Sequence, residues 1–515
     1  MNFKKLLSRQ ILLHDIAILC YISLIILIIP FSINEHFKFH RDEFLYIEMG
    51  KHLGWGYLEL PPIFGVISFI TQAILGGSLF AFRFVSALFN AAMALMTGLM
   101  VRELGGKRYA QILATVTFML YLRSGVLFQP VFLDQFIWIL CSLFIIKLFK
   151  NKTPRNWILV GVILGIGLLS KYTVLLFGFG FTVGLLLTPH RKSFLTKWPW
   201  LAGLTAFIIF LPNLIWQHLH DWPFFTFISA LSKQQLVNVT ISNFMIMQVL
   251  STFLAFPIAI IGLCHYFFSK EARIFQPLGW MYLTWLITLI LTKGKPYYLE
   301  PAYPMLIAGG CFWIGQFIQQ KGLKILKPAI LIILILGAIV RIPYSIPVLS
   351  PKSFIAYGKY MSENFNITEP LRWETGELHN LMQDYADMMG WENIVATTAK
   401  VYHSLTSEEQ DKCVIIATNY GFAGAINYYG DKYDLPKSLN FNGSFYLWGP
   451  GKLPGDIFIA VGFEKEHFEN WCDNVEVADI AKFELARESE VPIYLCRDPQ
   501  ITMQELWPRL AKYRF

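Results

Sequence analysis

A short polar stretch after the first long apolar run holds the residue types best suited to chemistry. Residues 40–62 contain four carboxylates, one arginine, one lysine and two histidines, together with tyrosines and a tryptophan. Charges this dense cannot all dissolve in lipid, where each costs roughly 3 kcal/mol. The stretch is therefore predicted to lie at a membrane surface, with its aromatic rings at headgroup level, as an amphipathic loop that carries the active residues.

The adjacent carboxylates Asp42 and Glu43 are the first candidates for catalysis. Neighbouring residues do not share one face of a helix, so one carboxylate can point at a reacting group while the other binds a structural partner, such as Arg41 or a helix N-terminus. A carboxylate beside a low-dielectric surface takes up a proton more readily, which suits a general base acting on a hydroxyl. The alternative is a solvated interfacial loop without a catalytic role.

The composition classifies the chain as an integral membrane protein. Hydrophobic residues make up 55% of the 515 residues and charged residues only 15%, far from the usage of soluble domains. About eleven apolar runs are predicted to be helices that cross roughly 30 Å of hydrocarbon. They lie near residues 11–33, 79–101, 108–123, 126–149, 156–170, 172–188, 197–217, 245–268, 274–292, 299–319 and 325–347.

The basic residues predict how these helices are oriented. The net charge is +8, but the lysines and arginines gather in short loops between apolar runs, so a nucleic-acid partner is not expected. The basic loops all fall on one side of the membrane, which the positive-inside rule makes cytoplasmic. The loop at 34–78 and everything after residue 347 then face outward. No cleavable signal is expected, because the first apolar run is too long for one.

Two segments are open to more than one interpretation. The runs 156–170 and 172–188 meet at Lys171, whose side chain either snorkels to the outer interface or lines a cavity. Residues 61–77 are apolar, but they begin with two prolines and end with two glycines. They are predicted to form a re-entrant or interfacial helix.

The composition changes after about residue 350, where charged residues become frequent and apolar runs shorten. Residues 413–418, 456–461 and 491–496 are predicted to be buried strands, and residues 377–390 and 392–403 have helical apolar spacing. The expected organisation is a transmembrane domain followed by a soluble α/β domain. Their bounds are predicted at 1–348, with the outer loop at 34–78, and at 349–515.

The cysteines of the C-terminal part show no metal-ligand spacing. Cys413 and Cys496 fall inside apolar strand patterns, and with Cys472 they make three, which leaves one unpaired in a single chain. No obligatory disulfide is expected. If one forms, the sequence favours a bridge between Cys413 and Cys496.

Further charged residues fall on the predicted outer face. Asp134 lies at the outer end of the fourth apolar run, where it is either a member of the active site or a charge that complements a helix dipole. Five cations lie on this outer face, where the positive-inside rule predicts few lysines and arginines. Each is either a snorkelling residue or a ligand. Together they could hold a phosphate group and stabilise its charge as it leaves. They are Arg83, Arg123, Lys171, Lys293 and Lys295.

Two further motifs give weaker signals of a binding site. His36, His40 and His52, with the nearby carboxylates, could hold a divalent metal ion, but they form no helical pair four residues apart. The metal site is left open. Residues 419–424 resemble a glycine-rich turn after a strand, but they lack the third-glycine spacing of nucleotide sites, so close packing of a strand and a helix is the favoured interpretation.

The motifs that carry a family resemblance run through most of the membrane part. They are Asp42-Glu43 with Tyr46, Glu48, Gly56, Pro61 and Pro62, then residues 80–90, 102–107, 161–172 and 295–304. These motifs resemble bacterial glycosyltransferase family 39, which includes relatives of the dolichyl-phosphate-mannose protein mannosyltransferases and of the aminoarabinose transferase that modifies lipid A. The resemblance implies a GT-C fold, with Asp42 as the catalytic base. Arg41, Tyr46, Glu48, Tyr57, Pro61 and Pro62 are expected to support the loop.

The implied activity is transfer of a hexose or pentose from a polyprenyl-phosphate donor to a hydroxyl of a lipid, glycan or protein acceptor, with inversion. The implied location is the outer face of the bacterial cytoplasmic (inner) membrane, with an extracytoplasmic C-terminal domain. No cofactor is obligatory for this chemistry. The alternatives are a transporter or flippase of lipid-linked sugars, which keeps ionisable residues near the bilayer midplane, and an inactive structural member of the same fold.

Overall fold

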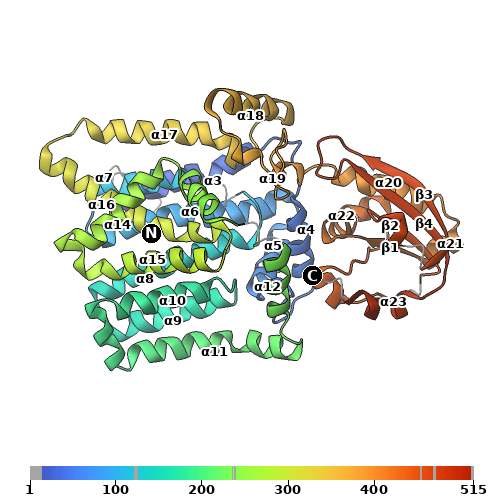
Figure 1. Cartoon of the computed structure of the whole chain (residues 1–515), viewed down its shortest axis with the longest axis horizontal. Helices are drawn as coiled ribbons and strands as arrows, with labels where there is room; N and C mark the ends of the chain where they lie inside the picture. The colour runs from blue at the N-terminus through green and yellow to red at the C-terminus, as the bar shows by residue number, and fades with distance from the viewer. Residues whose placement is uncertain are drawn as a thin grey trace, which may run out of the picture.

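A bundle of long helices and a smaller α/β part make up the computed structural model of the protein (Figure 1). The model describes residues 14–120, 126–234, 236, 239–452, 455–467 and 471–511. The bundle contains the first two thirds of the chain. The α/β part lies at one end of the bundle, beside the short helix α4 (Arg41–Lys51).

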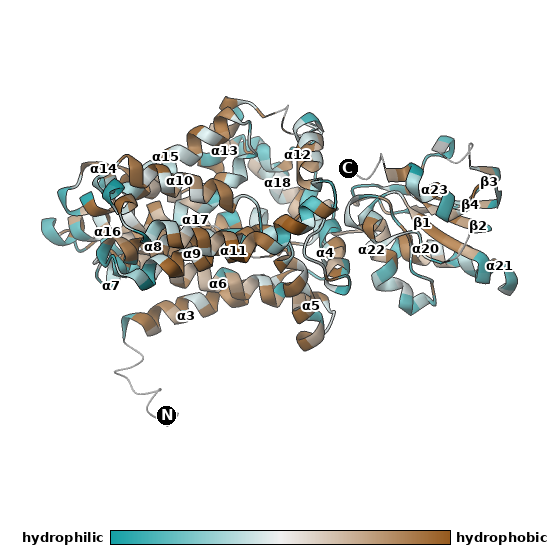
Figure 2. Ribbon diagram, turned by 90° about the horizontal axis from the view of Figure 1, so that it is seen from below, coloured by the Kyte–Doolittle hydropathy of each residue, from teal (hydrophilic) through white to brown (hydrophobic). Residues whose placement is uncertain are grey.

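Six of the described helices are long and apolar enough to cross a membrane, or up to eight spans if each of two bent helix pairs is one. The six cover Asp15–Ser32, Leu79–Glu103 (α6), Pro130–Lys150 (α8), Trp198–Leu219 (α11), Lys270–Leu291 and Leu326–Ser345 (α17), and the bent pairs are Val174–Leu186 (α10) with Pro189–Leu195, and Ile241–Thr252 (α13) with Ala255–Phe268 (α14). Hydrophobic residues dominate the ribbon of these helices in Figure 2. The chain is an integral membrane protein.

The expected count of about eleven spans is not confirmed, although each of the eleven apolar runs contains a helix. The three remaining runs form α7 (Arg108–Thr117), α9 (Pro154–Leu168) and α16 (Tyr303–Lys321), and part of the run at 108–123 lies outside the described residues. Helix α16 is buried against α14. A Cβ on Gly262 would lie 1.8 Å from the carbonyl oxygen of Leu306, so the two backbones touch, as small residues permit in membrane bundles.

Two short helices form the outer loop. After α4, the chain turns and enters α5 (Ile63–Leu75), which confirms a helix in residues 61–77. Helix α5 buries Phe64 and Ser68 and exposes Phe69 and Ile74. This one-sided exposure suits a helix that lies along a membrane surface.

The C-terminal part is built on a four-stranded sheet in the order β1-β2-β4-β3. Strands β1 (Cys413–Ala417) and β2 (Ile457–Val461) are parallel, whereas β4 (Glu490–Pro499) is antiparallel to both β2 and β3 (Cys472–Lys482). Helices α20 (Trp391–His403) and α22 (Tyr420–Tyr429) cover one face, and α23 (Met503–Leu510) covers the other. The predicted α/β class of this part is confirmed.

Some predicted elements of this part need correction. The three predicted strands and the helix at 392–403 are present, but residues 377–390 contain only the short helix α19 (Gln383–Ala386). The sequence did not predict strand β3. Most of its residues are exposed, so its apolar pattern is weak.

The expectation of no disulfide is wrong. Cys472 and Cys496 form a disulfide between the neighbouring strands β3 and β4, whereas Cys413 is buried and free. The antiparallel register places Val475 opposite Cys496 and Cys472 opposite Pro499, so the bridge runs diagonally between the strands. The apolar pattern around Cys496 correctly indicated burial. Its disulfide partner, however, is Cys472 and not Cys413.

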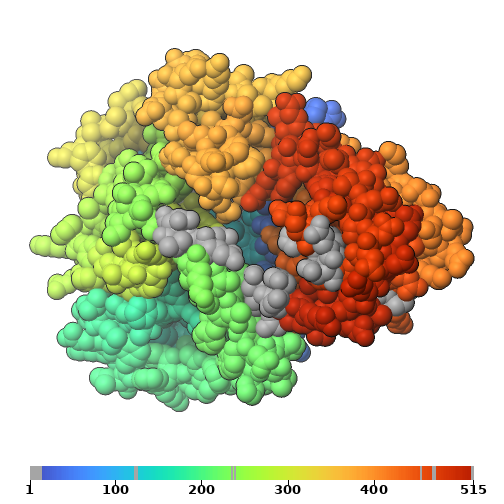
Figure 3. Space-filling model, turned by 45° about the vertical axis from the view of Figure 1, so that its right-hand side comes forward, coloured from blue at the N-terminus to red at the C-terminus, as the bar shows by residue number. Residues whose placement is uncertain are grey.

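The α/β part and the outer loop share one hydrophobic core. Phe39 and Phe44 lie in the same buried cluster as Trp391 of α20 and Phe422 of α22. The ring centroids of Phe44 and Trp391 are 5.2 Å apart. Figure 3 shows the orange-to-red C-terminal part against the helical bundle, with the surface hollowed between them. The domain bounds at 348 and 349 remain a prediction.

Candidate active site

Helix α4 begins with a capping box that fixes Glu43. His40 is the N-cap, and its backbone N–H donates to Glu43 Oε2 at 2.6 Å. The other carboxylate oxygen accepts a hydrogen bond from the backbone N–H of Phe128 at 2.8 Å. Glu43 is fully buried. Its contacts tie the start of α4 to the segment before α8, so the geometry gives Glu43 a supporting position.

Asp42 lies in the same helical turn but remains accessible, with about 31% of its side chain exposed. The Tyr420 hydroxyl donates to Oδ1 at 2.7 Å, and Gln129 Nε2 donates to Oδ2 at 3.3 Å. The ring nitrogen His40 Nδ1 lies 4.0 Å from Oδ2. The two adjacent carboxylates therefore differ as the sequence suggested: one is enclosed by structural bonds, and the other is held in place at an open surface.

Arg41 joins α4 to the C-terminal part. Its Nε donates to Asp387 Oδ1 at 3.0 Å, and a second nitrogen pairs with Glu488. Asp387 is 2% exposed and also accepts from Arg487 at 3.0 Å. A buried carboxylate needs such partners. Arg41 thus supports the loop by docking it onto the following domain.

A second charged group gathers around Asp134 in α8. Thr173 Oγ1 donates to Asp134 Oδ1 at 2.7 Å, and Lys171 Nζ lies 3.8 Å from Oδ2. Lys171 also lies over the rings of Tyr297 and Tyr298, at 5.6 and 5.3 Å from their centroids. Asp134 therefore neutralises and orients Lys171, which lines the site and does not extend into solvent alone.

Lys295 approaches the same tyrosines from the start of the 3-10 helix η6 (Pro296–Ala302). Its Nζ is 5.9 Å from the Tyr297 centroid and 3.7 Å from Glu374 Oε1. Burial raises the pKa of Tyr297, and the neighbouring Tyr298 adds to the increase. Lys171 and Lys295 therefore meet at the ring of Tyr297.

The other predicted phosphate ligands are not brought into this group. Arg83 is 4% exposed and donates to the backbone carbonyl of Lys38 at 2.6 Å. Lys293 is exposed at the end of the preceding helix, in a left-handed conformation with φ of 53°. Arg123 lies outside the described residues. In the described part of the chain, the cations at the site are Lys171 and Lys295.

The residues predicted to support the loop make internal contacts. The Tyr57 hydroxyl donates to the backbone carbonyl of Met49 at 2.9 Å, and the Tyr46 ring packs edge-on against Phe64. Glu48 pairs with Lys51 at 2.6 Å. Pro62 follows Pro61 as the N-cap residue of α5. These contacts hold the two short helices of the loop together.

Glu59 is a site carboxylate that sequence reasoning did not single out. Its two oxygens accept hydrogen bonds from the Ser444 backbone N–H at 2.8 Å and from the Ser444 hydroxyl at 2.5 Å. Burial raises the pKa of Glu59, the bonds from Ser444 lower it in part, and the charge of Asp42 raises it further. Glu59 is therefore held by the C-terminal part.

The three histidines considered for a metal site do not converge. His36 bonds Asn34 at 2.7 Å, and His52 stacks on Trp448 with ring centroids 4.3 Å apart. Among the described residues, no group of three or more His, Cys, Asp or Glu side chains could hold a metal ion.

Close packing explains the glycines of residues 419–424, but the element they contact is helix α4 and not the preceding strand that the sequence favoured. A Cβ on Gly424 would lie 2.4 Å from Phe44 Cβ, and one on Gly421 would lie 2.7 Å from Arg41 Cγ. Only glycine lets α22 approach α4 this closely. The same packing delivers Tyr420 to Asp42.

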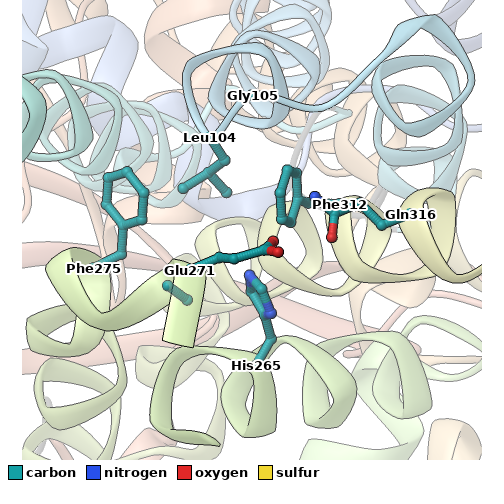
Figure 4. A pocket seen from close by; sticks show the side chains of 8 residues that line it. Leu104, Gly105, His265, Glu271, Phe275, Phe312 and Gln316 are labelled. Atoms are coloured by element: carbon teal, nitrogen blue, oxygen red, sulfur yellow. The ribbon is translucent and has the colours of Figure 1, made fainter. Parts of the chain in front are cut away.

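A separate cavity of about 280 Å³ lies away from this site. Figure 4 shows Glu271 and His265 pointing into it beside the Phe312 ring. Its lining comes from the loop after α6, the end of α14 and the basic loop at 270–273. It contains none of the predicted site residues.

Comparison with known proteins supports the resemblance indicated by the sequence. Residues 59–216 match the family of the dolichyl-phosphate-mannose-protein mannosyltransferases. This range includes Asp134 and Lys171 but not Asp42. A comparison with curated proteins found no match.

Solved structures of ArnT from Cupriavidus metallidurans share the fold over nearly the whole chain. The structure bound to undecaprenyl phosphate is 13% identical, with a TM-score of 0.57, and covers 93% of this chain and 97% of that chain. The apo structure is 11% identical, with a TM-score of 0.59 and the same two coverages. The chain therefore has the GT-C fold, as the resemblance implied, together with the C-terminal α/β part that the composition predicted.

Proposed function

We propose that this chain, which has the GT-C fold and a segment of the mannosyltransferase family, transfers a sugar from a polyprenyl-phosphate-linked donor to an acceptor hydroxyl. The observation that carries the proposal is the placement of Asp42. This accessible carboxylate is held by two hydrogen-bond donors, and the chain also brings two cations, Lys171 and Lys295, to the ring of Tyr297.

Each side chain has a distinct part in the proposed reaction. Asp42 accepts the proton of the acceptor hydroxyl while that oxygen bonds to the anomeric carbon of the sugar. The bond between the anomeric carbon and the phosphate oxygen breaks, and its electron pair leaves with the polyprenyl phosphate. Lys171 and Lys295 stabilise the charge of the departing phosphate. A single displacement of this kind inverts the configuration of the sugar and needs no obligatory cofactor.

The acceptor approaches from outside the cytoplasm in this proposal. The basic loops support that orientation. The Cys472–Cys496 disulfide supports it independently, because disulfides persist in oxidising compartments such as the bacterial periplasm. The donor's lipid tail lies in the membrane beside the helices. The proposal covers lipid, glycan and protein acceptors, and hexose and pentose donors alike.

Replacing Asp42 by Asn tests the function. The amide keeps the shape of the carboxylate but cannot take a proton, so turnover is expected to fall by about 10²- to 10⁴-fold, with little change in donor binding. The measurement is incorporation of label from polyprenyl-phosphate sugars into product by the purified full-length protein. The matched control is Asp431→Asn, which alters an exposed carboxylate paired with Lys437 and should leave turnover unchanged. Near-normal transfer by Asp42→Asn would favour the transporter or the inactive structural member.

A further inference from the structure

The C-terminal part contacts two carboxylates of the outer loop. The Tyr420 hydroxyl donates to Asp42, and Ser444 donates to Glu59 through its hydroxyl and its backbone N–H. Tyr420 is the first residue of α22, and Ser444 lies in the 3-10 helix η9 (Gly443–Trp448). Asp42 and Glu59 are thus held from outside the membrane bundle.

The position of Tyr420 is fixed by its own helix. The Asn419 side chain caps α22 by accepting a hydrogen bond from the backbone N–H of Phe422 at 3.0 Å. The close contacts at Gly421 and Gly424 then seat the helix directly on α4. Burial and the neighbouring charge of Asp42 raise the pKa of Tyr420 well above its usual value, so the phenol keeps its proton and remains a donor.

Docking of the C-terminal part does not depend on the bond to Asp42. Arg41 pairs with Asp387, and the hydrophobic core is shared across the boundary. Another phenol of the same helix, that of Tyr428, donates to the backbone carbonyl of Gly77 at 2.9 Å. The C-terminal part is therefore attached to the membrane part by several contacts besides the Tyr420 hydroxyl.

We propose that Tyr420 is a positioning residue for the reaction: its hydroxyl fixes Oδ1 of Asp42 while Gln129 holds Oδ2, so that the carboxylate keeps one orientation toward the acceptor hydroxyl. This inference rests on the function proposed above. It makes the C-terminal part a component of the active site, because a side chain 378 residues away in the sequence sets the orientation of the base.

Tyr420→Phe tests the inference, since it removes the hydroxyl and keeps the ring. We expect kcat of the full-length protein to fall about tenfold, while the KM for the donor and the thermal unfolding midpoint stay as in the wild type. The matched control is Tyr428→Phe, which removes a phenol hydrogen bond between the same helix and the membrane part. It should leave kcat unchanged. An equal loss of kcat in Tyr428→Phe would assign the effect to docking and overturn the proposal.

A double-mutant cycle separates positioning from an independent effect. If Tyr420 acts through Asp42, then Tyr420→Phe should cause no further loss in an Asp42→Asn background, measured as residual product over long incubations. The same tenfold loss in both backgrounds would overturn the inference, as would a Tyr420→Phe protein that has full activity or fails to fold. If the wild type transfers sugar and Asp42→Asn does not, a normal Tyr420→Phe refutes this inference alone. No transfer by the wild type would overturn the proposed function as well.

Discussion

At the scale of single residues, the carboxylates of the outer loop differ in which groups surround them. Glu43 accepts two backbone hydrogen bonds and is fully buried, whereas Asp42 is held by side-chain donors and stays accessible. Glu59 is intermediate, since it is enclosed but depends on Ser444. Because such environments set which carboxylate can exchange a proton, neighbouring acidic residues of one loop acquire different tasks.

Glu59 should make stability depend on pH. A carboxyl group whose pKa is raised in the folded state holds its proton more tightly there than in the unfolded chain. Its stabilising contribution is therefore fully present below the unfolded pKa of about 4.3 and is lost as the pH rises through the higher folded value. Relative to Glu59→Gln, the wild type should lose stability as the pH rises above the unfolded pKa of about 4.3.

The measurement is the thermal unfolding midpoint of the purified protein at a series of pH values. Glu490→Gln serves as the control, because it changes an exposed glutamate paired with Lys482, and it should follow the wild type. A constant difference between the wild type and Glu59→Gln over this range would contradict the argument.

At the scale of elements, two short connecting segments bring the cations to the site. Lys171 comes from the turn between α9 and α10, and Lys295 precedes η6. Their electrostatic surroundings differ, since Lys171 is paired with the buried Asp134 and Lys295 with the exposed Glu374. Lys295 can therefore leave its partner for a phosphate at lower cost.

Lys295→Met should weaken donor binding more than it slows turnover. The methionine keeps much of the length of the side chain but removes the charge-assisted contact, so the donor KM should rise about tenfold. The measurement is the initial rate as a function of donor concentration. Lys400→Met, at an exposed lysine paired with Asp479, is the control. A donor KM that stays at the wild-type value would exclude Lys295 as a phosphate ligand.

Sequence patterns predicted the helices and strands better than they predicted the contacts between them. The apolar runs identify the helices because lipid requires continuous hydrophobic surface, and the buried strands β1, β2 and β4 stand out for a similar reason. Strand β3 exposes most of its residues and gives no such signal. Its missed assignment also hid the disulfide partner of Cys496.

The charged loop was identifiable as a site, but its partners were not. Asp42 and Glu43 stand out through the density of charge beside an apolar run. Tyr420 and Ser444 lie 378 and 385 residues from the carboxylates they bind, inside ordinary-looking segments of another domain. Only the tertiary packing of α22 on α4 reveals them.

At the scale of the whole molecule, the expected orientation places the site and the sheet outside the cytoplasm. A phosphatase that is active only outside the cytoplasm, fused after residue 515, should therefore be active. The same enzyme fused at Lys152, in a basic loop, should be inactive. The measurement is phosphatase activity of intact cells. An inactive fusion at the C-terminus would reverse the assignment of the catalytic face.

Because α4 shares a hydrophobic core with the C-terminal part, this core can form only after most of the chain has been synthesised. Asp42 is made 378 residues before Tyr420, which at a rate of 5–20 residues per second is a delay of roughly 20 to 75 s. During that interval the helical bundle can enter the membrane while Asp42 still lacks its hydrogen bond from Tyr420. A chain that stops before α22 therefore carries the acidic pair without the hydroxyl that is proposed to orient it.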